Sequence, residues 1–133
     1  MSKKHSSASI WKVVLHDEFD VEFEALTDDV KDNLLAAANA IQIAGPKAGR
    51  PHVDTLGGSK HANMKELRFT AHDGREVWRA AFAFDPERRA IVLVAGEKQG
   101  TSQGLFYKRL IKIADERFDR HLKQLKTGLK PER

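Results

Sequence analysis

Three apolar runs between residues 63 and 98 constrain the fold more than any other feature of this 133-residue chain. In each run the side chains alternate between two faces of an extended backbone, so every second residue shares a side. Each run also carries one cation, at the position where the strand period puts it on a surface shared with the other two. The runs are Asn63–Phe69, Val77–Asp85 and Ile91–Lys98, and their cations are Arg68, Arg79 and Lys98.

The middle run sorts the two faces of the expected sheet most clearly. Alternation separates large aromatic side chains from small ones, with Trp78, Ala80, Phe82 and Phe84 on one face and Arg79, Ala81 and Ala83 on the other. We expect the aromatic face to be core and the alanine face to form a shallow hollow that another molecule can approach, with Arg79 at its end. A sheet with one packed face and one open face is ordinarily antiparallel.

The same count assigns the two flanking runs. Leu67 and Phe69 are predicted to point into the core and Arg68 into the hollow. On the third run, the hollow side is predicted to hold Val92, Val94 and Lys98. A simpler interpretation stays open, in which the three cations are only solvated, because Arg and Lys are mostly exposed in proteins.

The part of the chain before these runs predicts one short strand and two helices. Residues 10–15 have the composition of a strand, and Asp17 has the side chain of a helix N-cap. An apolar stripe with helical spacing follows from Phe19 to Ala44. Thr27 interrupts the stripe with a second capping side chain, which indicates two helices or one sharply bent helix. The Gly-Pro pair at residues 45–46 ends the second helix.

The remaining segments complete an α+β layout. Residues 47–62 are rich in Gly, Pro and His and predict a long surface loop. Turns at 72–75 and 86–89 join the three cationic strands as hairpins, and an apolar stripe over 107–125 predicts a final helix. The order is therefore an N-terminal strand, two helices, an antiparallel sheet of three further strands and a C-terminal helix. We expect the helices to cover one sheet face and to leave the other free.

The length predicts one domain over residues 1–133, with flexible tails at 1–9 and 127–133. Cysteine is absent, which excludes disulfides and thiolate chemistry and suits a cytoplasmic protein. No signal sequence or membrane-spanning apolar run is seen, and the net charge of +4 favours an anionic partner, nucleic acid first. The histidines and carboxylates form no metal-binding motif, so neither a metal site nor another cofactor is expected.

Several ordered segments resemble a known family. Residues 49–68, the motif Phe-Ala-Phe-Asp-Pro at 82–86, Val-Ala-Gly-Glu-Lys at 94–98 and Phe-Tyr at 106–107 resemble the HigB-like, phage-derived branch of the RelE/ParE toxin superfamily. The resemblance runs from about residue 10 to residue 122 and implies a RelE-like fold. It also implies a toxin of a type II toxin–antitoxin pair, a metal-independent endonuclease that cleaves messenger RNA on the ribosome and inhibits translation. The implied partner is a helix-turn-helix antitoxin.

Fold alone does not decide between functions in this superfamily, because its ParE-like members poison DNA gyrase. A non-nucleolytic toxin that binds gyrase and an inactive nucleic-acid-binding domain are therefore the alternatives. We expect the antitoxin to lay an acidic or amphipathic segment over the hollow or to block ribosome access from the helix side.

Metal-independent RNA cleavage needs a base for the 2′-hydroxyl, cations for the phosphorane and an acid for the leaving 5′-oxygen. Arg68 and Arg79 suit the cation role, because a guanidinium stays charged and meets phosphate oxygens through two parallel hydrogen bonds. Lys98 is the candidate for proton transfer or a further phosphate contact, with its pKa lowered by the two arginines. Tyr107 can supply a phenol or stack on a base, and core packing is its alternative role.

Three further residues are candidate RNA contacts. His61 and Lys65 resemble family positions near the site, and Arg75 lies in the turn between the first two cationic strands. Strict alternation puts Lys65 on the face opposite Arg68, so a bulge is needed to bring it round. The chain also departs from the best-known family pattern, because it continues well past Tyr107 as a helix and a basic tail.

Overall fold

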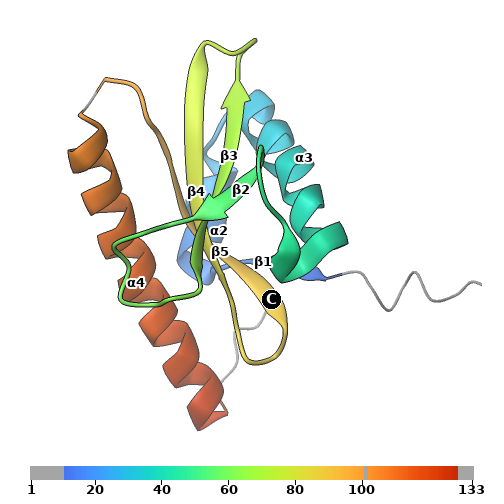
Figure 1. The fold of residues 1–133 in the computed structure, drawn as a ribbon, viewed down its shortest axis with the longest axis vertical. Helices are drawn as coiled ribbons and strands as arrows, with labels where there is room; N and C mark the ends of the chain where they lie inside the picture. The colour runs from blue at the N-terminus through green and yellow to red at the C-terminus, as the bar shows by residue number, and fades with distance from the viewer. Residues whose placement is uncertain (1–10, 101, 129–133) are drawn as a thin grey trace, which may run out of the picture.

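The computed structural model describes residues 11–100 and 102–128, and its chain forms a mixed five-stranded sheet between helices (Figure 1). Of the tails expected at 1–9 and 127–133, residues 1–9 and 129–133 lie outside the described residues, and Thr127 is the last residue of a helix. The elements in order are β1 (Lys12–Leu15), α2 (Asp17–Glu24), α3 (Asp28–Ala44), η1 (Gly45–Lys47), β2 (Val53–Thr55), β3 (Met64–Ala71), β4 (Glu76–Phe84), β5 (Arg89–Glu97) and α4 (Gln103–Thr127).

The sheet order is β1-β5-β4-β3-β2. The strands β3, β4 and β5 pair antiparallel, as the two hairpin turns predict. β1 pairs parallel with β5, because the chain passes through both helices and the β3–β4 hairpin before it returns to that edge. The α+β class predicted from the sequence is therefore confirmed, and it is compatible with a RelE-like fold.

Helices cover both faces of the sheet, which corrects the expectation of a free alanine face. α2 and α3 pack on the aromatic face, where Phe82 and Leu67 are completely buried and Phe69 is nearly so. α4 packs on the other face, where Ala81 and Ala83 are also completely buried (Figure 1). The small alanine side chains that were expected to leave a hollow for a partner instead let the chain's own C-terminal helix approach the sheet.

A β-bulge in β5 changes which side chains face α4. Ala81 pairs with Val94 but its neighbour Phe82 pairs with Val92, so Leu93 is an extra residue without a partner in β4. Val92 consequently joins Phe82 in the α2–α3 core, and its predicted position on the hollow side is wrong. Val94 lies on the α4 side as expected, because the bulge precedes it.

The segment between the second helix and the cationic strands is more ordered than a surface loop. It contains η1 and the short edge strand β2, which pairs antiparallel with β3. Val53 and Leu56 are almost fully buried, in the two different cores. The loop-like composition of this segment does not reveal β2, because only one of its three residues, Val53, is buried in the core.

Two of the three helix caps predicted from the sequence are confirmed. Thr27 Oγ1 accepts a hydrogen bond from the Val30 N–H, and Gly45 ends α3 with a positive φ of 58°. Gly128 ends α4 in the left-handed conformation. At the start of α2 the cap is His16 rather than Asp17, since His16 Nδ1 accepts from the Glu18 N–H. Asp17 is instead the first helical residue.

α4 is fixed to the sheet by polar contacts at two points. Arg117 is buried, donates to the Leu93 carbonyl in the bulge at 2.8 Å, and forms a bidentate pair with Glu22 of α2. Nearer the end of the helix, His121 Nε2 lies 2.9 Å from the fully buried carboxylate of Asp85. Because buried polar groups are costly without partners, both contacts hold α4 in a single register along the sheet.

Asp85 makes this second contact sensitive to acid. Burial alone would raise the pKa of Asp85, but hydrogen bonds from His121 and Arg89 lower the pKa below its ordinary value of 3.8. Ionised Asp85 therefore stabilises the fold above about pH 4, and that contribution is lost as the pH falls through the lower, folded-state pKa.

We predict that Asp85→Asn lowers the free energy of unfolding by about 3 kcal/mol at pH 7, because it removes one partner of a buried ionic contact. Urea unfolding at pH 7 and at about pH 3 measures the effect, and the difference between variant and native protein should shrink at the lower pH. Asp73→Asn, in an exposed turn, is the control. A difference of the same size at both pH values would contradict this account of Asp85.

Candidate functional site

The strand pairing brings the predicted cations to one place on the α4 side of the sheet. Arg68 of β3 and Arg79 of β4 are directly opposed in the antiparallel register. Arg79 in turn opposes Gly96 of β5, two residues before Lys98. Because these positions share the period of two beyond the bulge, Arg68, Arg79 and Lys98 belong to one face, as predicted.

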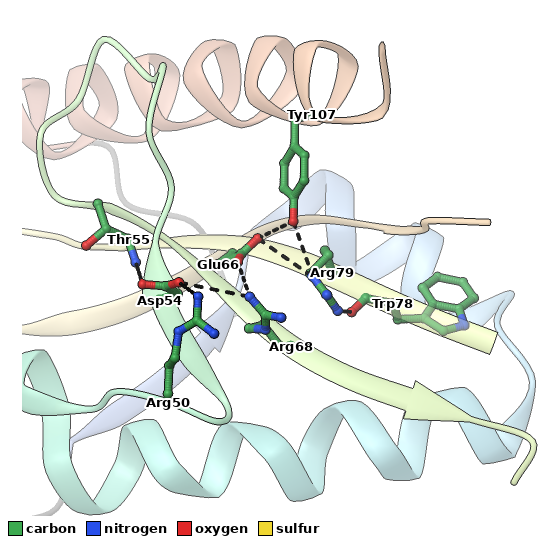
Figure 2. A network of polar contacts seen from close by, with 8 residues as sticks. All are labelled: Arg50, Asp54, Thr55, Glu66, Arg68, Trp78, Arg79 and Tyr107. Atoms are coloured by element: carbon green, nitrogen blue, oxygen red, sulfur yellow. Dashed lines mark hydrogen bonds and ion pairs between the residues drawn. The ribbon is translucent and has the colours of Figure 1, made fainter. Parts of the chain in front are cut away.

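Glu66 lies between Arg68 and Arg79 (Figure 2), and sequence reasoning did not find it. Its side chain is 6% exposed. One carboxylate oxygen accepts from the Tyr107 hydroxyl at 2.7 Å and lies 3.8 Å from Arg79 Nε, and the other accepts from an Arg68 guanidinium nitrogen at 3.1 Å. The sequence did contain one indication of this role: Glu66 lies two residues before Arg68, which places both side chains on the same face of one strand.

Tyr107 reaches this carboxylate from the second turn of α4 (Figure 2). Its hydroxyl donates to Glu66 and accepts from Arg79 Nε at 3.3 Å. Its ring packs edge-on against Phe106, with centroids 5.2 Å apart, and belongs to the margin of the α4 core. The two roles considered for Tyr107 are therefore combined in one side chain, since the ring is packed and the hydroxyl enters the site.

The environment of Tyr107 keeps its phenol protonated. Burial raises the pKa of Tyr107 above its ordinary value of 10.0, and the hydrogen bond to ionised Glu66 raises it further. The hydrogen bond from Arg79 lowers the pKa but does not reverse the shift. At neutral pH the group is a proton donor.

Lys98 has the opposite shift. It follows β5, where its backbone N–H donates to the Val77 carbonyl at 2.7 Å, and its ammonium lies 5.6 Å from the centroid of the Tyr107 ring. Burial lowers the pKa of Lys98, and repulsion from Arg79 and Arg68 lowers it further, with Glu66 opposing. A lowered pKa of Lys98 is what the sequence predicted, although burial contributes more to it than the two arginines do.

A second carboxylate lies at the outer margin of the cluster. Asp54 Oδ2 pairs with the exposed Arg50 at 2.8 Å and lies 3.9 Å from Arg68 (Figure 2). Arg68 thus lies between two acids, the buried Glu66 and the more exposed Asp54. Together Arg50, Arg68, Arg79 and Lys98 outnumber these two carboxylates, so the site retains positive charge.

The two arginines can be reached from solvent although α4 covers part of the face. The side chain of Arg68 is 28% exposed and that of Arg79 is 7% exposed. Both line an open groove of about 540 Å³ between α3 and the outer edge of β3. Arg79 is therefore held in place by its neighbours and still faces a space that a ligand can enter.

The other three candidate residues lie outside the contacts of Glu66. His61 Nε2 lies 2.8 Å from Asp119 of α4, and its ring packs edge-on against Phe118. Lys65 takes the face opposite Arg68 that strict alternation predicts, and no bulge interrupts the pairing of β3 with β4 at this position. Arg75 is exposed in the β3–β4 turn. The structure therefore brings together Arg68, Arg79, Lys98 and Tyr107 and leaves these three apart.

Over residues 11–100 and 102–128, no group of three or more His, Asp or Glu side chains is placed to hold a metal ion. Within the same ranges no helix has both the length and the apolar character needed to cross a membrane. The chemistry that the cluster can perform with its own groups is phosphate binding by guanidinium, together with proton transfer by Lys98 and Tyr107.

The structure is a small basic α+β domain, compatible with a RelE-like fold, in which a buried carboxylate holds two arginines and a tyrosine. The chain belongs to the phage-derived Gp49-like family (DUF891), whose model matches residues 21–119. This match confirms the predicted resemblance to a phage-derived branch, and it includes every candidate site residue named above.

Two curated relatives carry toxin names. The chain is 47% identical over 100 residues to "Putative toxin HigB2" of Mycobacterium tuberculosis, a match that covers 75% of this chain and 48% of the relative. It is 38% identical over 110 residues to "Putative toxin HigB3" of the same organism, covering 83% of this chain and 92% of that protein. The chain thus spans about half the length of the first relative and most of the second. No solved structure matches the chain.

We predict that Tyr107 ionises with a midpoint above 10.0, and that Glu66→Gln moves the midpoint down, because the ionised carboxylate opposes formation of a phenolate. Tyr107 is the sole tyrosine of the sequence, so the tyrosinate absorbance in a pH titration reports it alone. Glu97→Gln, an exposed change on β5, should leave the midpoint where it is. A midpoint unaffected by Glu66→Gln would show that the 2.7 Å contact is absent in solution.

Proposed function

We propose that this protein is the toxin of a type II toxin–antitoxin pair and that it cleaves messenger RNA on the ribosome without a metal ion. Its partner is a small helix-turn-helix antitoxin. Family membership and the toxin names of two relatives support the first part. The convergence of Arg68, Arg79, Lys98 and Tyr107 around one carboxylate supports the second.

Glu66 marks the place where the scissile phosphate binds. Its two oxygens accept hydrogen bonds from Arg68 and Tyr107 and form an ion pair with Arg79 at 3.8 Å, and two oxygens of a phosphate can take the same places. A phosphate that takes over these donors meets an excess of positive charge, since Lys98 adds to the two arginines. Arg68 and Arg79 then stabilise the negative charge that grows on the phosphorane.

Proton transfer is divided between Lys98 and Tyr107 according to their shifted pKa values. Neutral Lys98 takes the proton from the 2′-hydroxyl, whose oxygen attacks phosphorus, while Tyr107 gives its proton to the departing 5′-oxygen. The phosphorus–5′-oxygen bond breaks, leaving a 2′,3′-cyclic phosphate and a 5′-hydroxyl. No water molecule is consumed in this step, so the mechanism does not require an activated water.

The antitoxin must act elsewhere than on the alanine face. An acidic segment cannot lie over Ala81 and Ala83, because α4 already buries both. Of the two routes considered for inhibition, this leaves a block of ribosome access from the helix side.

Arg79→Ala should lower messenger RNA cleavage by about 100-fold or more, because it removes a preorganised donor from the charge that develops in the transition state. Primer extension on transcripts after induction measures the cuts. Arg109→Ala, an exposed arginine on α4, is the matched control and should cleave as the native protein does. Intact transcripts with accumulating DNA breaks after induction of the native protein would contradict the nuclease proposal and indicate a gyrase-directed toxin. Growth without arrest would indicate an inactive nucleic-acid-binding domain.

The pH dependence tests Lys98 as the base. Its lowered pKa predicts a cleavage rate that rises with pH and levels off below the ordinary lysine value of 10.5. Lys98→Arg keeps the charge but cannot lose its proton at these pH values, so the rising limb should disappear along with most of the rate. Single-turnover cleavage by ribosome-bound toxin from about pH 6 to 9 provides the profile. An unchanged profile in Lys98→Arg would assign the base role to another group.

A further inference from the structure

The groove beside Arg68 and Arg79 has features that phosphate binding alone does not require. It lies between α3 and the outer edge of β3, and its volume of about 540 Å³ falls within the range of small-ligand sites. A single phosphate group would fill only a small part of this space. The groove therefore has room for a larger molecule of which the phosphate is one end.

The groove exists because β2 covers only part of β3. The last paired residue of β2 is Val53, opposite Leu67, and the His52 carbonyl then accepts from the Arg68 N–H at 2.7 Å. Beyond that point the described chain places no strand outside β3. On the helix side the groove is lined by Asn33, Ala36 and Ala37, and the small side chains of the two alanines leave the space open.

The chemistry of the lining changes along the groove. Arg68 and Arg79 provide positive charge, while the remaining walls carry polar groups and apolar surface. The polar groups are the Asn33 amide, whose Nδ2 donates to the Asp29 carbonyl at 2.7 Å, the His52 imidazole and the Thr70 hydroxyl, and the apolar surface includes Phe69 and Ala36. Concentrated positive charge beside hydrogen-bonding groups and an apolar surface matches a phosphate joined to an unpaired nucleoside.

We propose that this groove binds one unpaired nucleoside of single-stranded RNA, the one attached to the phosphate held by Arg68 and Arg79. The inference rests on the proposed function, and it assigns the base and sugar next to the cleaved bond to a defined surface. The nucleoside lies against α3 and the edge of β3, where polar side chains line the groove beside the base. An acidic peptide fits less well, because the positive charge of the groove is confined to its arginines.

The test fills the groove without touching either arginine. Ala36→Phe places a ring in the space, and Gln42→Phe places the same ring on the β1 side of the same helix, outside this groove. The probe is a fluorescein-labelled, 2′-O-methylated single-stranded RNA oligonucleotide, which binds but cannot be cleaved. We expect Ala36→Phe to weaken its binding by about 10-fold or more and Gln42→Phe to leave it unchanged, as measured by fluorescence anisotropy.

A second variant guards against a folding defect in the first. Asn33→Ala removes a polar group from the groove without adding volume, and should weaken RNA binding by about 3-fold or more. Thermal unfolding of all three variants shows whether the fold is retained. If Ala36→Phe does not fold, Asn33→Ala decides the result alone.

The possible outcomes separate the groove from the cleavage reaction. Native binding in Ala36→Phe and Asn33→Ala with weak binding in Arg79→Ala would overturn the groove assignment and leave the proposed function intact. Weak binding in both groove variants together with uncut transcripts in vivo would support the groove and overturn cleavage. Loss of poly-glutamate binding but not of RNA binding in Ala36→Phe would overturn the assignment and indicate an acidic peptide. Absence of oligonucleotide binding by the native protein would overturn the groove assignment and leave cleavage on the ribosome to be decided by primer extension.

Discussion

A carboxylate that is almost removed from water organises the site. Ionised Glu66 would be costly in that position without partners, and it obtains them from two strands and a helix in the form of Arg68, Arg79 and Tyr107. The same interaction prevents two facing guanidinium groups from repelling each other before a ligand arrives. The protein therefore has a preformed anion-binding site that is occupied by its own Glu66 carboxylate. Another anion must bind Arg68, Arg79 and Tyr107 more favourably than this carboxylate in order to displace it.

α4 has a double role in this arrangement. It closes the sheet face at Ala81 and Ala83, and it delivers the Tyr107 hydroxyl to the margin of the area that it closes. A site that is half covered by a helix restricts water around the arginines, which strengthens electrostatic interactions there. The open side, toward α3, is then the direction from which an extended chain can reach Arg68 and Arg79.

Simple periodicity predicted much of this structure. Alternation along β3 and β4 correctly placed Leu67 and Phe69 in the core and Arg68 and Arg79 on one shared face, because regular strands keep a strict period of two. It failed for Val92, because one extra residue at a bulge reverses the period and leaves no mark in the sequence. It also failed for the free face: alanines next to a cation suit an open hollow and a closely packed helix equally well. Glu66 was missed because a lone acid on a strand is ordinarily solvated, and its burial depends on α4, whose position is a tertiary property.

The bulge at Leu93 has a mechanical consequence for a reaction site some distance away. Arg117 donates hydrogen bonds to the Leu93 carbonyl in the bulge and to Glu22. It lies ten residues after Tyr107 along a helix whose rise is about 1.5 Å per residue. An α-helix transmits an axial slide with little loss, so movement at this anchor would displace the phenol by a similar amount. The β-bulge therefore sets the axial position of α4, and through it the position of the Tyr107 hydroxyl in the site.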